Sequence, residues 1–264
     1  MSNARATRLA LTCDANHLFL NHFFEAALMR RFDSPLGIFW SQRFAFAALT
    51  CFALVSGGAI HADDAVPAEM NGLPLVFHEN FEDGIKRWET TDDEAWELSS
   101  KDGNTSFGLN RRKSDYQPKH RSPHNIALIK DLALTDFVMQ YRVRSTKDTG
   151  NHRDCCTFFC HQDAEHFYYV HMGAKPDPHS GQIMIVNDAP RKAITENERK
   201  VPWDDEWHTI RLERLSKNGT IKVYFDNMEE PHMEVKDATF DKGRIGIGSF
   251  DDMNEFDDIV IYGK

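Results

Sequence analysis

Aromatic and nitrogen-bearing side chains gather between residues 166 and 191. The stretch His166–Met172 reads H-F-Y-Y-V-H-M and is predicted to form a β-strand with rings or imidazoles on both faces. An ordinary strand of a β-sandwich alternates apolar residues with Lys, Glu or Thr. Rings with polar tips can stack on sugars and form hydrogen bonds with their hydroxyls. The stretch therefore indicates a surface that binds carbohydrate, without identifying a reaction.

One face of this strand supplies the first candidate ligands. Tyr169 and His171 are two positions apart, so they share a face. We expect this face to look outward over an open groove, because Val170 and Met172 suit the interior together with Tyr168. The predicted substrate-binding residues, from this strand and the segments after it, are Tyr169, His171, His179, Asn187 and Arg191.

Several functions are compatible with these residue types. Aromatic faces with amide and guanidinium donors suffice for binding without catalysis. A polysaccharide lyase would use a Tyr or His for proton transfer and Asn, Arg or His to neutralise a uronate, although the known lyase motifs are not matched. A glycosidase needs two carboxyls that flank the bond, and no diagnostic pair stands out among Asp154, Asp163, Glu165 and Asp188. A structural interaction module without a sugar ligand is a further alternative.

Three of the five cysteines, Cys155, Cys156 and Cys160, lie within six residues. On a regular strand Cys156 and Cys160 would share a face about 13 Å apart, too far for a disulfide. We interpret the three as small buried hydrophobic residues. Neither a C-x-x-C spacing nor a second ligand pair favours zinc.

Residues 1–62 have the character of a leader. Arg43 precedes an apolar run of 12 residues from Phe44 to Val55, and small residues then lead to Asp63. This order is typical of a secretory signal, and the run is shorter than the roughly 20 residues of a transmembrane helix. We predict a secreted or periplasmic protein with no stable membrane insertion after leader cleavage. An uncleaved anchor is the alternative, and translation beginning at Met29 would shorten the leader.

Beyond the leader we predict a flexible lead-in over 63–72 and one domain over 73–264. This part holds 26 basic and 38 acidic residues, a net charge of −12. Such an acidic exterior argues against nucleic acid as a partner. Two short basic runs, 111–113 and 119–121, are interpreted as a solvated loop that would also suit an acidic glycan.

Period-two alternation dominates from residue 73 onward. Runs such as 137–144, 208–214 and 221–226 alternate apolar with polar residues, and turn signals such as Lys217-Asn218-Gly219 separate them. Many short strands without a long amphipathic helix predict an all-β fold, a two-sheet antiparallel sandwich.

The two ends of the domain carry a known signature. The opening, 77–88, reads F-H-E-N-F-E-D-G-I-K-R-W, and the closing parts, 243–250 and 256–261, read G-R-I-G-I-G-S-F and F-D-D-I-V-I. Together they resemble the concanavalin A-like lectin and glucanase superfamily, and within it secreted bacterial 3-keto-disaccharide hydrolase-like domains. The resemblance implies a jelly roll that binds glycan on its concave sheet. The resemblance is specific for the fold, but it says little about which activity the protein has.

The resemblance also implies a metal. Several such folds hold a structural calcium ion on the convex side, bound by an Asp that corresponds to Asp257 and by backbone carbonyls. Calcium needs several oxygen ligands, and Glu79 and Glu82 are expected nearby. The alternative is that Asp257 is an exposed strand residue.

Overall fold

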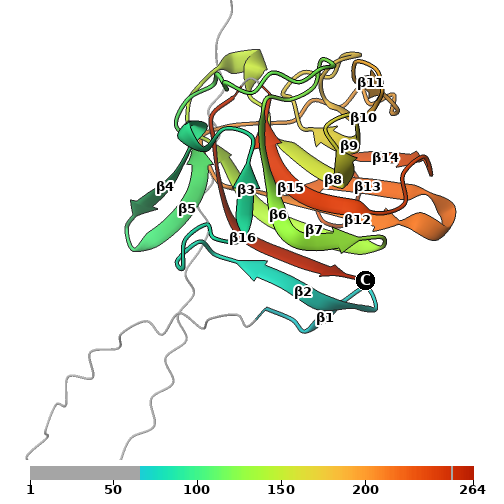
Figure 1. Ribbon diagram of the computed structural model, residues 1–264, viewed down its shortest axis with the longest axis horizontal. Coiled ribbons are helices and arrows are strands. Elements are labelled where there is room, and N and C mark those ends of the chain that lie inside the picture. Colours follow the sequence, from blue (N-terminus) through green and yellow to red (C-terminus); the bar gives the residue numbers. More distant parts are fainter. Residues whose placement is uncertain (1–65, 251) are drawn as a thin grey trace, which may run out of the picture. The chain divides into compact units, whose positions relative to one another are not determined.

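The protein is described by a computed structural model that covers residues 66–250 and 252–264. Two antiparallel sheets pack face to face, as Figure 1 shows. The predicted all-β fold, a two-sheet antiparallel sandwich, is confirmed. The predicted leader, 1–62, lies outside the described residues. Within the described part, no helix combines the length and apolarity needed to cross a membrane.

The first sheet has nine strands, and its main path runs β1-β2-β16-β7-β12-β13-β14. The β4–β5 hairpin joins it through β16. Its strands are β1 (Glu69–Met70), β2 (Leu73–Glu79), β4 (Trp96–Lys101), β5 (Asn104–Leu109), β7 (Phe137–Ser145), β12 (His208–Leu215), β13 (Thr220–Phe225), β14 (Met233–Lys236) and β16 (Asn254–Gly263).

The second sheet has seven strands in the order β11-β10-β9-β8-β15-β6-β3. They are β3 (Trp88–Thr90), β6 (Asn125–Leu134), β8 (Cys156–Asp163), β9 (His166–His171), β10 (Gln182–Asn187), β11 (Lys192–Ala193) and β15 (Gly243–Ser249). Three short 3-10 helices, Asp93–Ala95, Gly150–His152 and Ser216–Asn218, complete the described elements.

Strand β1 differs from the expectation for 63–72. Glu69 and Met70 pair with Pro74 and Leu73 of β2, so the sheet begins inside the segment predicted as a lead-in. Asn71 and Gly72 form the tight turn, with φ of 53° and 76°. Gly tolerates this left-handed conformation and Asn adopts it more readily than most residues.

The main core lies between the two sheets. Alternate residues of β7 point inward, and this strand shows a strict buried and half-buried alternation over its second half. Tyr168, Val170 and Met172 of the β9 region are in this core, as expected from their side-chain types. Burying one such side chain is worth about 1.5–3 kcal/mol, which is why alternation determines the orientation of each strand.

The outer face of the seven-stranded sheet carries a second apolar cluster. Its members include Phe158, Phe167, Tyr169, Met184 and Phe250. A sheet that is apolar on both faces must be covered on both. Residues outside the strands therefore have to shield this face from water.

Because of a β-bulge in β8, two cysteines lie on opposite faces of the sheet and not on the same face as predicted. Cys156 belongs to the outer cluster, whereas Cys160 points into the main core. The pairing register of β8 shifts after Phe159, and Cys160 has φ of +47°. An extra residue in one strand reverses the alternation beyond it, so the predicted shared face is wrong. All three cysteines are buried thiols that form no disulfide among the described residues, as predicted.

Arg214 of β12 is fully buried without a carboxylate partner among the described residues. Its guanidinium donates to the carbonyls of Gly219, Asp237 and Phe240 at 2.7–2.9 Å. One side chain thus holds the turn after β12 and the chain that follows β14 to the core. Buried charges are retained only when such hydrogen bonds compensate for lost hydration.

Replacing Arg214 with Ala should cost roughly 3–5 kcal/mol in the free energy of unfolding, because three carbonyls, those of Gly219 and Phe240 in buried hydrogen bonds, lose their donor. Urea denaturation of the two proteins measures the loss. The control is Arg142→Ala, since the Arg142–Asp258 ion pair is exposed and such pairs contribute less than about 1 kcal/mol. Equal effects of the two substitutions would contradict this account.

Candidate functional site

Residues 110–124, here termed the covering segment, connect β5 to β6 and shield the outer cluster. In Figure 1 this is the green loop along the top of the domain. Tyr116 of the segment packs against the cluster. The segment has no regular secondary structure apart from turns and bends, so specific polar contacts must hold it.

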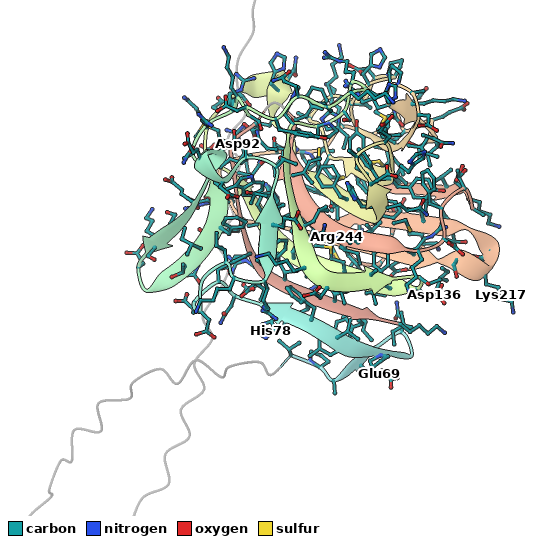
Figure 2. The ribbon with its side chains drawn as sticks, in the orientation of Figure 1. Glu69, His78, Asp92, Asp136, Lys217 and Arg244 are labelled. Carbon is teal, nitrogen blue, oxygen red and sulfur yellow. The ribbon has the colours of Figure 1, made fainter. Side chains whose placement is uncertain are left out.

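Asp92, labelled in Figure 2, anchors the start of the covering segment. Its carboxylate accepts from the Arg111 guanidinium at 2.8 Å and from the backbone N–H of Asp115 at 2.7 Å. The Asp115 N–H lowers the pKa of the Asp92 carboxyl; partial burial opposes this and Arg111 adds to it. The carboxylate is thus held in its ionised form.

Hydrogen bonds attach the end of the covering segment to the connections that precede β9 and β11. Lys119 and His120 contact the Glu165 carboxylate at 2.6 and 3.1 Å. The carbonyl of Arg121 accepts from the backbone N–H of Arg191 at 3.0 Å. The basic runs predicted to be solvated are therefore partly used to attach the segment to the turn between β8 and β9 and to the loop before β11.

Phe250, directly after β15, divides two hollows beside the covering segment. Its ring stacks on His171 with centroids 5.8 Å apart and meets His124 edge-on at 5.4 Å. The guanidiniums of Arg191 and Arg121 lie 4.3 and 5.3 Å from the ring centroid. Two cations over one buried aromatic face concentrate positive charge at this point.

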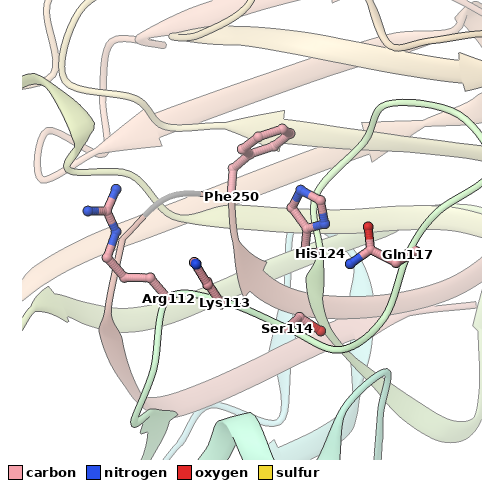
Figure 3. A pocket seen from close by; sticks show the side chains of 6 residues that line it. All are labelled: Arg112, Lys113, Ser114, Gln117, His124 and Phe250. Carbon is pink, nitrogen blue, oxygen red and sulfur yellow. The ribbon is translucent and has the colours of Figure 1, made fainter.

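The first hollow, shown in Figure 3, has a volume of about 470 Å³. Apart from Phe250, its wall comes entirely from the covering segment. The lining residues are Arg112, Lys113, Ser114, Gln117, His124 and Phe250. It is a polar hollow with two basic side chains at its rim.

The second hollow, here termed the His171 recess, has a volume of about 230 Å³. It brings together the end of β9, the loop after it, the turn before β8 and the turn before β11. Its lining residues include Arg153, Asp154, His171, Lys175, His179 and Arg191. Basic groups outnumber acids here, in contrast to the acidic domain as a whole.

A buried Asp–His pair forms the floor of the recess. Asp154 and His171 are only 2% and 5% exposed, and Oδ2 of Asp154 lies 3.4 Å from Nε2 of His171. Oδ1 of Asp154 accepts from the Ser249 hydroxyl at 2.7 Å and the Phe250 N–H at 3.0 Å. Burial raises the pKa of the Asp154 carboxyl, but His171 and these donors lower it by more.

Several polar atoms around the recess lack a hydrogen-bond partner among the described residues. They are Nε and Nη1 of Arg191, Nη1 of Arg153 and the hydroxyl of Tyr169. Leaving a buried donor unsatisfied costs about 1–3 kcal/mol, and more for a charged group. Clusters of such atoms are uncommon in folded proteins and call for a functional explanation.

The structure brings together three of the five predicted ligands. His171, His179 and Arg191 line the recess. Tyr169 lies on the same outer face of β9 as His171, but its ring is fully buried in the outer cluster. The expected open groove over Tyr169 is therefore wrong, because the covering segment and Phe250 close it.

Asn187 lies apart from the other predicted ligands. It pairs with His166 at one end of the β9–β10 ladder, whereas His171 pairs with Gln182 at the other end. Five residues of strand separate the two positions by roughly 16 Å. Asn187 is exposed and does not line the recess.

The carboxylates considered for hydrolysis are also separated. Asp163 and Asp188 flank the ring of His166, at 2.8 and 3.0 Å from its two nitrogens. These hydrogen bonds raise the pKa of His166. Glu165 is engaged by the covering segment, and of the four only Asp154 reaches the recess, where Asp177 is a second lining carboxylate. Both are already engaged by protein groups: Asp177 accepts from the His179 N–H at 2.7 Å, and Asp154 accepts from the Ser249 hydroxyl and the Phe250 N–H.

Asp257 of β16 is fully buried rather than exposed. Its carboxylate accepts from the Asn104 amide at 2.9 Å and from the Asp258 N–H at 2.8 Å. Burial raises its pKa, and the Asn104 hydrogen bond opposes this shift. Glu79 and Glu82 each accept from other protein donors. The predicted calcium site at Asp257 stays a prediction.

Sequence reasoning missed Arg153 and Phe250 as parts of the site, and considered Asp154 only as one of four carboxylates that form no diagnostic pair. Asp154 and Arg153 precede β8 and have no distinctive spacing relative to His171. The G-S-F ending of β15 was noticed as a fold signature, but its ring was not expected to divide two hollows. The basic runs of the covering segment were the one available signal for a cationic surface.

Comparison with known proteins gives structural likenesses of low identity. A carbohydrate-binding module, CBM66, from Bacillus subtilis is 14% identical, with 68% of this chain and 97% of the module covered at a TM-score of 0.49. A cellulose-induced protein is 12% identical over 70% of this chain and 96% of its own, also at 0.49. An endo-β-galactosidase from Clostridium perfringens is 15% identical over 75% and 64%, at 0.46.

No family model and no curated protein sequence matches the chain. The fold is therefore assigned from the strand order described above.

Acid should release the covering segment. Because the Asp92 carboxyl has a depressed pKa in the folded protein, its stabilising contacts are fully present above its ordinary value of about 3.9. They are lost as the pH falls through the lower folded value. Hydrogen exchange of the Asp115 amide should accelerate over that range, relative to amides of β7.

At neutral pH, Asp92→Ala should make the covering segment a preferred site for trypsin, which cleaves after its Lys and Arg residues. Asp83→Ala, an exposed carboxylate on a neighbouring turn, is the matched control. Unchanged cleavage in the Asp92 variant would show that the other attachments suffice.

Proposed function

We propose that this protein binds carbohydrate in the His171 recess, and that it prefers sugars bearing a carboxylate or another anionic group. The proposal rests on Arg191, whose guanidinium lies over Phe250, lines the recess and has no acidic partner among the described residues. An Arg fork binds a carboxylate through two parallel hydrogen bonds. An anionic sugar would supply the missing acceptor.

The rest of the recess suits a sugar as well. His179, Ser180 and Lys175 lie along its wall and offer donors and acceptors for hydroxyls. Phe250 itself is only 4% exposed, so it supports the guanidiniums rather than offering a stacking platform. Recognition would therefore be mainly polar, and long-range attraction to an anionic polymer would weaken with salt.

The leader-like sequence and the acidic exterior support a secreted or periplasmic location for this binding. Of the activities that the family resemblance implies, a 3-keto-disaccharide hydrolase stays a prediction. Two carboxylates, Asp154 and Asp177, line the recess, but Asp154 is buried and both accept hydrogen bonds from the protein, which does not favour a hydrolysis of the two-carboxylate type.

A polysaccharide lyase is the second candidate, and a specific juxtaposition favours it. His171 and Arg191 share the recess, so a base and a group that neutralises a uronate would lie together. Tyr169 would not take the proton at neutral pH. Burial raises the pKa of its hydroxyl well above the usual value, and Cys156 adds to this shift while Arg191 opposes it.

Arg191→Gln should weaken binding of a polyuronate by roughly tenfold to a hundredfold, since hydrogen bonds to charged groups contribute about 1.5–3 kcal/mol. Calorimetric titration of the mature protein with oligouronates measures the loss, with a neutral oligosaccharide of the same length for comparison. Lys192→Gln, the exposed neighbour on β11, is the control and should bind normally. Equal affinity of wild type and Arg191→Gln would exclude the proposed role of the guanidinium.

A measurement of product formation distinguishes a protein that only binds the polymer from a lyase. A lyase would convert the polyuronate into unsaturated products that absorb in the ultraviolet, and His171→Gln would abolish this signal. Tight binding without products indicates a binding module. Neither binding nor turnover on a broad glycan array would favour an interaction module instead.

A further inference from the structure

Three metal-binding side chains of different types meet at the floor of the His171 recess. A carboxylate oxygen of Asp154, the sulfur of Cys156 and a ring nitrogen of His171 all lie within 4.8 Å of one another. All three residues are at least nine-tenths buried. The sheet register brings them together, because Cys156 of β8 is directly opposite His171 of β9 and Asp154 precedes Cys156 by two positions.

The hydrogen bonds of His171 determine which nitrogen is available. Nδ1 lies 3.0 Å from the carbonyl oxygen of His179, and a carbonyl only accepts, so Nδ1 carries the proton. In a neutral imidazole Nε2 then presents a lone pair, and it faces an oxygen of the Asp154 carboxylate. Two acceptors facing each other in a buried site need a cation between them, either a proton or a metal ion.

The distance between these two atoms favours a metal. At 3.4 Å the Nε2–Oδ2 separation exceeds the roughly 2.7–3.2 Å of a normal N–H···O hydrogen bond. Nitrogen and oxygen ligands about 2.0–2.1 Å from one tetrahedral zinc ion are roughly 3.4 Å apart. The Cys156 sulfur lies within the same 4.8 Å cluster, and a thiolate is a preferred zinc ligand.

The surroundings match those of metal ligands in proteins. A ligating His usually donates its other nitrogen to a carbonyl, and a ligating carboxylate is itself hydrogen-bonded. His171 does the first, and Asp154 does the second through Ser249 and the Phe250 N–H. A divalent ion with one carboxylate and one thiolate is neutral, so Arg153 and Arg191 nearby do not oppose it.

An independent observation points to a further ligand at this place. The hydroxyl of Tyr169 is fully buried and has no hydrogen-bond partner among the described residues. The Tyr169 ring lies on the same face of β9 as His171, with the two ring centroids 6.2 Å apart. A water or sugar oxygen on the metal would give this hydroxyl a partner.

We propose that Asp154, Cys156 and His171 form a binding site for a zinc-type divalent cation, with its fourth position open to the recess. Three protein ligands with one open position are typical of zinc sites that bind and polarise a ligand oxygen. The sequence did not suggest this site, because its ligands come from two strands and include only one cysteine. The site does not depend on the proposed preference for anionic sugars.

Cobalt(II) tests the proposal directly, because a Co²⁺–thiolate bond gives a near-ultraviolet charge-transfer band. The mature protein, without a histidine tag and treated with a chelator, should bind one equivalent of Co²⁺ with this band, and Zn²⁺ should displace it. Cys156→Ser should abolish the band and weaken Zn²⁺ binding by more than about 100-fold, exceeding the loss of an outer-shell partner.

Cys155→Ser and Cys160→Ser are matched controls, since both cysteines are buried but point into the main core. Both should keep the band. If Cys156→Ser does not fold, His171→Gln replaces it, with thermal stabilisation by Zn²⁺ as the readout, and this stabilisation should disappear. No Co²⁺ band in the wild type, or a band that survives in Cys156→Ser, would overturn the proposal and leave a protonated His171 paired with Asp154.

Discussion

The seven-stranded sheet is apolar on both faces, and this constraint shapes the rest of the molecule. One face packs against the nine-stranded sheet, as in any sandwich. The other face carries rings such as Phe158, Phe167 and Tyr169, which would otherwise be exposed to water. The covering segment and Phe250 shield them from water. Polar side chains lie at the edge of this cover, and they line the His171 recess.

The shield explains why the site is polar and cationic in an acidic protein. A long irregular segment cannot satisfy its own backbone groups and must be attached by side-chain contacts. Arg111, Lys119 and His120 serve this purpose through Asp92 and Glu165. The remaining basic groups gather beside Phe250, where low exposure strengthens their attraction to an anion.

The floor of the recess holds an ionised carboxylate that is fully buried. Asp154 keeps a low pKa despite full burial because His171, Ser249 and the Phe250 N–H compensate for lost hydration. Such a carboxylate requires a fixed partner on its other oxygen. The same geometry that stabilises the ionised carboxylate aligns it with an imidazole and a thiol, and this alignment is the basis of the proposed cation site.

The sequence alone determined the sandwich, since period-two alternation and turn residues act locally and dictate which side chains face the core. It also indicated His171, His179 and Arg191, whose types suit sugar binding wherever they lie. Only the tertiary structure decided that Tyr169 is sealed, that Asn187 lies at the far end of the ladder and that Cys156 and Cys160 face opposite ways. Those outcomes depend on a bulge, on the strand register and on a distant loop, and none of these leaves a periodic signal in the chain.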